Sequence, residues 1–146
     1  MKVLGLEHVA IAVRDARAVA RVISSALGLS TGEMEDVDKD GVRVIKVSLG
    51  DTDLELVEPS TDTSSISRFL EKRGEGLHHI CLRVDDVEAS LRSLKEKGVP
   101  LIDEVPRRGA TGRRIAFVHP RGVGGVLIEL SERAEDRTRG EESRRS

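Results

Sequence analysis

Apolar and polar residues alternate along residues 76–84, which read Gly-Leu-His-His-Ile-Cys-Leu-Arg-Val. This period of two predicts a strand with one buried face. The buried side carries Ile80, Leu82 and Val84, and the other side carries His79, Cys81 and Arg83. A histidine on the less apolar face of a strand can point into a cavity, so His79 becomes a candidate for chemistry.

The same pattern opens the chain, because residues 4–13 also alternate and place a histidine, His8, early in a strand. His8 and His79 are 71 positions apart (79 − 8), and two candidate helix caps, Asp15 and Asp86, have the same spacing (86 − 15). Asp is a favoured residue at the start of a helix. The chain therefore contains an internal repeat.

Each repeat predicts one strand, one helix and three further strands. For the first we expect strands at 4–13, about 32–37, 42–47 and 54–57, with a helix from Asp15 to Gly28. For the second we expect strands at 76–84, 101–105, 115–119 and 126–130, with a helix from Asp86 to Gly98. The predicted fold class is α+β, with two tandem βαβββ modules.

We expect one domain over residues 1–132, with module one at about 4–59, a connecting helical segment at 60–75 and module two at about 76–132. Residues 133–146 are almost entirely charged, small or polar. Such a composition cannot bury enough apolar surface to fold alone, so we expect a disordered tail.

Composition narrows the class of protein. The 146 residues are 38% hydrophobic and 34% charged, with a net charge of −2, so nothing favours nucleic-acid binding. The sole cysteine, Cys81, excludes an intrachain disulfide and is compatible with a reducing cytoplasm. No apolar run reaches membrane-spanning length, and the start of the chain is too short for a signal peptide.

Each repeat also closes on a strand glutamate. Glu55 and Glu129 are 74 positions apart (129 − 55), and both are flanked by core-type residues that leave the glutamate on the other face. With His8 and His79 they form a duplicated set that suits one divalent metal ion such as Zn, Co, Ni, Mn or Fe(II). Taken singly, each residue has a plainer interpretation, as a hydrogen-bonded histidine or a solvent-facing glutamate.

Three other features carry chemistry less specifically. We expect His78 to be structural or to support a ligand, and His119, before Pro120, to fix a turn. The basic loop holds Arg107, Arg108, Arg113 and Arg114. It could bind phosphate or carboxylate, or be an ordinary solvated loop.

The stretches "LEHVAIAV", "LELVEP", "ISRFLEKRGEGLHHICLRV" and "PRRGATGRRIAFVHPRGVGGVLIEL" together resemble the vicinal oxygen chelate superfamily and, within it, the methylmalonyl-CoA epimerase family. The resemblance covers residues 4 to 132. It implies a cup-shaped mixed sheet and one metal ion held by His8, Glu55, His79 and Glu129. It also implies a cytoplasmic homodimer of propionate metabolism that acts on an acyl-CoA.

The activity implied is interconversion of (R)- and (S)-methylmalonyl-CoA through a metal-stabilised enolate, with Glu129 as the base for one face. Some family members place a second glutamate on the third strand, where this chain has Val44. We therefore expect Lys46, another segment or a water to serve the second face, and Lys46, Arg107 and Arg108 to bind substrate. Two rival functions are a glyoxalase-I-like lyase and a metal-independent binding protein, and the intact His/Glu set disfavours the latter.

Overall fold

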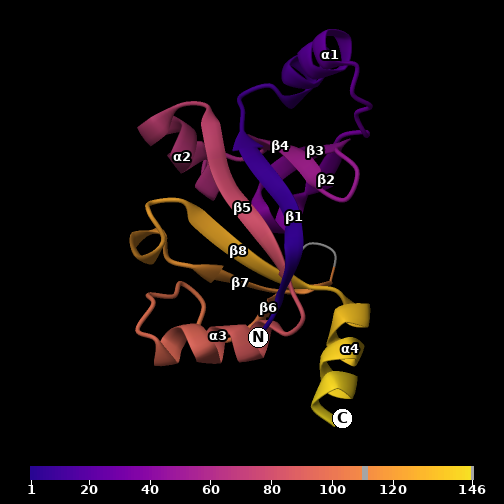
Figure 1. Ribbon diagram of the computed structural model, residues 1–146. Helices are drawn as coiled ribbons and strands as arrows, with labels where there is room; N and C mark the ends of the chain where they lie inside the picture. Colours follow the sequence, from indigo (N-terminus) through magenta and orange to yellow (C-terminus); the bar gives the residue numbers. More distant parts are fainter. Residues whose placement is uncertain (110–111, 146) are drawn as a thin grey trace. The chain divides into compact units, whose positions relative to one another are not determined.

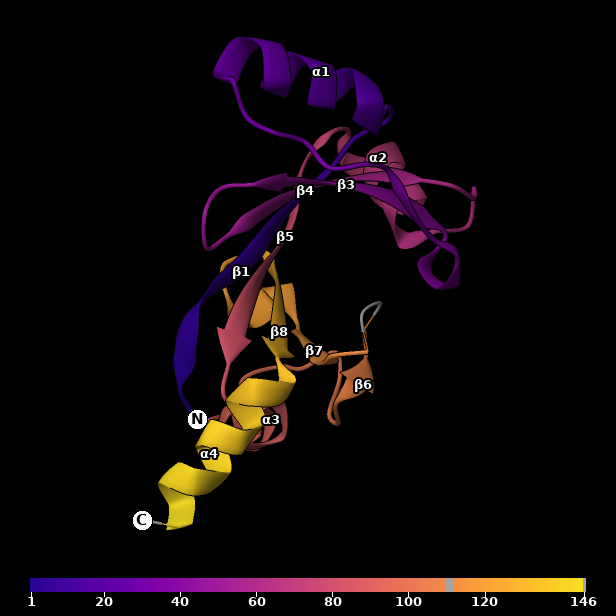
Figure 2. The ribbon, with the colours of Figure 1, turned by 90° about the vertical axis from the view of Figure 1, so that its right-hand side faces the viewer.

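The computed structural model describes residues 1–109 and 112–145. Its chain divides into two compact units (Figures 1 and 2), one comprising His8–His78 and the other comprising Met1–Glu7 with His79–Ser146. We call these the His8 unit and the His79 unit. Both boundaries fall inside strands, β1 (Val3–Ala12) and β5 (Gly76–Val84), immediately beside the two repeated histidines.

The His8 unit is a sheet with a helix on each face. Its strands lie in the order β2-β3-β4-β1; β4 is parallel to β1 and antiparallel to β3. The remaining elements are α1 (Ala16–Leu27), β2 (Glu35–Val37), a 3₁₀ turn (Asp38–Asp40), β3 (Val42–Ser48), β4 (Asp53–Pro59) and α2 (Ser65–Arg73). The predicted order of one helix and four strands is confirmed.

Side chains that alternate along the strands pack against different helices. Ile45, Val47 and Leu56 pack with α1, which lies over β3 and β4 in Figure 2. Their neighbours in sequence, Val44 and Val57, face the other way and pack with α2. Because side chains alternate with a period of two, every residue of these strands can be assigned to the α1 face or the α2 face.

The His79 unit repeats the connectivity. It contains β5, α3 (Val87–Glu96), β6 (Arg107–Arg108), β7 (Arg114–Val118), a 3₁₀ turn (Pro120–Gly122), β8 (Leu127–Glu132) and α4 (Ala134–Arg145). Strands β5 and β8 are parallel, whereas β8-β7-β6 are antiparallel. Helix α3 packs through Val87 and Leu91 on Val84, Ala116 and Leu130.

The repeat extends to how each helix begins. Asp15 accepts a hydrogen bond from Ala18 N–H at 3.0 Å, and Asp86 accepts one from Ala89 N–H at 2.9 Å, as predicted. A strand glutamate also reaches the first turn of each helix. Glu58 accepts from Ala16 N–H at 3.3 Å, and Glu132 accepts from Val87 N–H at 2.8 Å. Burial raises the pKa of Glu132, although the hydrogen bond from Val87 opposes that rise.

Two predictions about elements were wrong. Residues 101–105 do not form a strand; only Leu101 makes an isolated bridge, to Val118, and the short β6 lies at Arg107–Arg108 instead. The N–H groups of Ile102 and Asp103 both donate to the carbonyl of Phe117, which interrupts the regular ladder. Residues 134–145 form α4 rather than a disordered tail, and Asp136 in its first turn is fully buried.

Candidate metal centre

His8 and Glu55 form a close pair in the His8 unit. His8 Nε2 lies 2.9 Å from Glu55 Oε2, and each side chain is 16% exposed. Glu55 stands opposite Ala10 in the parallel register of β1 and β4, so it shares the α2 face with Ala10 and Ala12. Both alanines are fully buried in the cluster that packs on α2.

His79 and Glu129 form the equivalent pair in the His79 unit. His79 Nε2 lies 3.1 Å from Glu129 Oε2, and the side chains are 13% and 11% exposed. Glu129 stands opposite Cys81 in the parallel register of β5 and β8. Ala10 and Cys81 are 71 positions apart, and Glu55 and Glu129 are 74 apart, so the backbone pairing follows the sequence repeat.

The chemistry of both pairs fits a divalent cation. Divalent cations of the zinc and cobalt kind bind imidazole nitrogen and carboxylate oxygen at about 2.0–2.2 Å, so two ligands that meet at a right angle in a six-coordinate site lie about 3 Å apart. The two His–Glu pairs have separations of 2.9 and 3.1 Å. Each unit thus presents one nitrogen and one oxygen donor at a spacing compatible with neighbouring ligands of one six-coordinate ion, which is also the spacing of a direct His–Glu hydrogen bond.

The residues opposite the two glutamates on their antiparallel neighbours differ. Lys46 stands opposite Glu55, so it lies on the same face of the His8 unit, and its side chain forms no ion pair with any described residue. Phe117 occupies the corresponding place opposite Glu129. Val44, two residues before Lys46, is buried in the cluster with α2. A buried valine offers no group that could move a proton.

Arg107 lies on the Glu129 face through its contact with Phe117. Its guanidinium carbon is 4.9 Å from the centroid of the Phe117 ring. The Phe117 ring in turn meets the His79 ring edge-on, at a centroid distance of 6.0 Å. Arg108 is the next residue of β6 and alternates away from Arg107.

Other predicted residues have structural contacts. His78 meets Phe69 edge-on, with ring centroids 5.0 Å apart, and Cys81 is fully buried. His119 fixes the following turn as expected, because its Nδ1 accepts a hydrogen bond from Arg121 N–H at 3.1 Å. Arg114 pairs with Glu132 and Glu88. Part of the predicted basic loop, residues 110–111, lies outside the described residues.

Sequence reasoning missed a charged cluster on Glu7. This buried carboxylate accepts hydrogen bonds from Arg113, on the basic loop, and from Arg133, just after β8. Burial raises the pKa of Glu7, but the bonds to the two arginines outweigh burial and hold that pKa below its usual value. The only signal in the sequence was a charged residue directly before His8 in an otherwise apolar strand.

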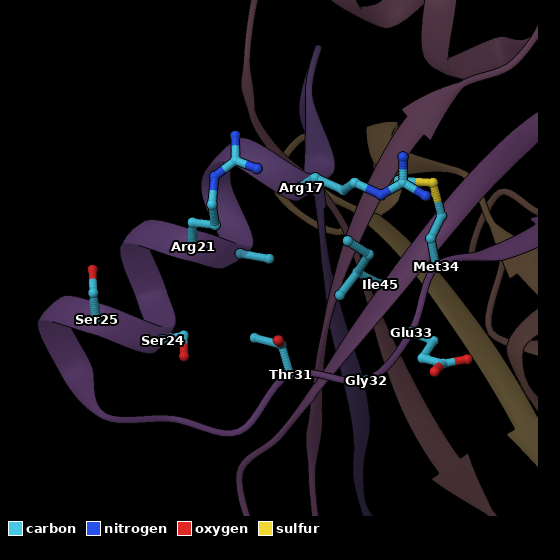
Figure 3. Close-up of a pocket in the computed structure, with 10 residues that line it drawn as sticks. Arg17, Arg21, Ser24, Ser25, Thr31, Gly32, Glu33, Met34 and Ile45 are labelled. Carbon is cyan, nitrogen blue, oxygen red and sulfur yellow. The ribbon is translucent and has the colours of Figure 1, made fainter.

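A groove of about 830 Å³ lies on the other face of the His8 unit (Figure 3). It is lined by Arg17, Ala20 and Arg21 of α1 and by Ile45 of β3. Because Ile45 packs on the α1 face, the sheet separates this groove from His8 and Glu55. The groove is therefore not part of the candidate metal centre.

Comparison with known proteins decides the family. Residues 7–117 match the model of the glyoxalase/bleomycin resistance protein/dioxygenase superfamily. The chain is 40% identical over 128 residues to the mitochondrial methylmalonyl-CoA epimerase of Homo sapiens, covering 87% of this chain and 73% of the human protein. It belongs to the methylmalonyl-CoA epimerase family. An ethylmalonyl-CoA/methylmalonyl-CoA epimerase of Cereibacter sphaeroides is also 40% identical, covering 87% of this chain and 96% of that protein.

Solved structures agree with this assignment. The methylmalonyl-CoA epimerase of Mycobacterium tuberculosis superposes with a TM-score of 0.82 at 39% identity, covering 90% of this chain and 89% of that one. A methylmalonyl-CoA epimerase in complex with methylmalonyl-CoA and NH4+ superposes with a TM-score of 0.83 at 33% identity, covering 91% and 96%. The expected vicinal oxygen chelate fold is confirmed. No helix in the described part of the chain has the length and apolar character needed to span a membrane.

Proposed function

We propose that this chain interconverts (R)- and (S)-methylmalonyl-CoA by moving the α-proton, with one divalent metal ion bound by His8, Glu55, His79 and Glu129. The observation that carries the proposal is the repeated His–Glu pair, at 2.9 and 3.1 Å, in a chain of this epimerase family. A metal-independent binding protein would have no need of two such pairs. Family membership also favours a homodimer that acts in the cytoplasm in propionate metabolism.

The donor set limits which ions are suitable. Two imidazoles and two carboxylates suit borderline cations such as Co, Zn, Mn or Ni, and four protein ligands leave open positions on an ion that takes six. When bound, such a cation lowers the free energy of the negative charge that develops on the thioester oxygen as the α-proton leaves. Charge stabilisation of this kind makes a carbon acid reactive toward a carboxylate base.

Glu129 is our candidate for the proton-transfer residue. Its carboxylate is largely buried beside His79, so it is shielded from bulk water. It would accept the α-proton and return it.

The opposite face of the planar enolate needs another proton-transfer group, and Val44 cannot supply one. Lys46 shares the face of His8 and Glu55 and is our candidate there. Arg107, on the Glu129 face, would add positive charge for the substrate's anionic groups, whereas Arg108, which the sequence also suggested for substrate binding, lies on the opposite face of β6.

The test is to incubate metal-loaded protein with a single epimer of methylmalonyl-CoA in deuterium oxide. We expect the optical purity of the substrate to fall while deuterium appears at the α-carbon, because each inversion passes through a deprotonated intermediate. Absence of both inversion and exchange would contradict the proposal. Turnover of the methylglyoxal–glutathione hemithioacetal in the same preparation would then establish the rival lyase.

A further inference from the structure

Arg107 is held in place by a nearly buried carboxylate. Asp103 Oδ2 lies 3.2 Å from Arg107 Nε and also accepts a hydrogen bond from Phe117 N–H at 2.8 Å. The Asp103 side chain is 17% exposed. One carboxylate thus ties the arginine to the strand that lies beside Glu129.

The guanidinium plane has a defined place as well as a defined anchor. It lies over Phe117, which stands opposite Glu129 and touches the His79 ring. Among the described residues, Asp103 is the only carboxylate paired with Arg107, and it engages the Nε side. A guanidinium has five N–H donors in a rigid fork, so donors remain for a second oxyanion.

We propose that Arg107 binds the free carboxylate of a malonyl-type thioester and thereby distinguishes such substrates from simple acyl thioesters. This inference rests on the proposed function, and it names the group that Arg107 recognises. The carboxylate is bonded directly to the carbon that loses its proton, so it must lie close to Glu129. The phosphates of coenzyme A are separated from that carbon by the pantetheine arm, roughly 15 Å when extended.

The repeat supports a cation at this place. In the His8 unit the position opposite the ligand glutamate is itself a cation, Lys46. In the His79 unit the same position is Phe117, and the positive charge comes from the Arg107 guanidinium that lies over the Phe117 ring. Both units therefore place one positive charge beside one ligand glutamate, and in the described part of the chain Arg107 is fixed by an ion pair with Asp103 and a ring contact with Phe117.

The test compares binding of malonyl-CoA and acetyl-CoA, which differ by one carboxylate, to metal-loaded protein by calorimetry. We expect the wild type to bind malonyl-CoA more tightly than acetyl-CoA. Arg107→Ala should weaken the binding of malonyl-CoA by about 10–100-fold and leave the binding of acetyl-CoA unchanged. Arg107→Lys keeps the positive charge but lacks the paired N–H donors of the guanidinium. It should therefore retain only part of the preference for malonyl-CoA over acetyl-CoA. Asp103→Asn should lower the preference less than Arg107→Ala, since Asp103 only positions the arginine.

Arg92→Ala is the matched control, because Arg92 is an exposed arginine on α3. Equal weakening of both ligands in Arg107→Ala would overturn the inference and show that Arg107 contacts coenzyme A instead. An unchanged preference would also overturn it. The readout is binding, so a lack of epimerisation would count against the proposed function and leave this test intact.

Discussion

Asp136 and Arg83 are joined by two hydrogen bonds, of 2.8 Å from Nε and 2.6 Å from Nη2 of the arginine. Asp136 is fully buried, and its Oδ2 atom also accepts a hydrogen bond from Arg133 N–H. The bonds from Arg83 hold the pKa of Asp136 below its usual value. This pair fixes the first turn of α4 to β5, so the start of the C-terminal segment is part of the folded unit.

Removing this carboxylate should therefore lower stability. We expect Asp136→Ala to reduce the free energy of unfolding by about 2–3 kcal/mol, because it leaves the Arg83 guanidinium without its bidentate partner. Truncation after Glu132, which removes Asp136 together with the rest of α4, should have at least the same effect. Urea unfolding followed by circular dichroism measures both. Glu142→Ala, an exposed change on the same helix, should behave like the wild type.

The same pair predicts a pH dependence. The pKa values of Asp136 and Glu7 are lowered in the folded state, so both carboxylates stabilise the fold above their unfolded-state pKa values. That contribution is lost as the pH falls through the folded-state pKa values, on the acid side of about pH 4. Urea titrations from pH 7 to pH 3 should show the gap between wild type and Asp136→Asn narrowing with acid. A gap that stays constant would contradict this account.

Much of the site could be predicted because strand alternation fixes faces. Leu54 and Leu56 lie with the α1 core, so Glu55 must face the other way, and the same holds for Glu129 between Ile128 and Leu130. The helix starts at Asp15 and Asp86 were predictable because an aspartate cap has a local sequence signature. These features depend only on neighbouring residues.

The features that were missed depend on distant partners. Helix α4 has no apolar periodicity, and what anchors it is a contact between Asp136 and Arg83, 53 positions away. Residues 101–105 contain enough apolar residues to suggest a strand, but Asp103 uses its side chain to bind Phe117 N–H, so the segment does not pair regularly. The anchoring of Arg107 on Phe117 follows from that same departure and could not be read from the basic loop.

Glu129 and Glu55 should respond differently to loss of charge. In Glu129→Gln the amide oxygen can still ligate a metal but cannot accept a proton, so we expect turnover to fall by about 10²–10⁴-fold while much of the bound metal is kept. Glu55→Gln is the matched variant from the repeat. We expect it to lose far less turnover, since Glu55 has only a ligand's role in our proposal. Equal losses in the two variants would refute the assignment of Glu129 as the base.

The central claim is that two His–Glu pairs act as one metal centre, and counting bound ions tests it most directly. Native mass spectrometry of the cobalt-loaded protein should show one ion per chain. His8→Ala and His79→Ala, equivalent changes in the repeat, should each abolish tight binding, and circular dichroism should show that both variants remain folded. Two ions in the wild type, with one lost in each variant, would show two independent sites and contradict the account.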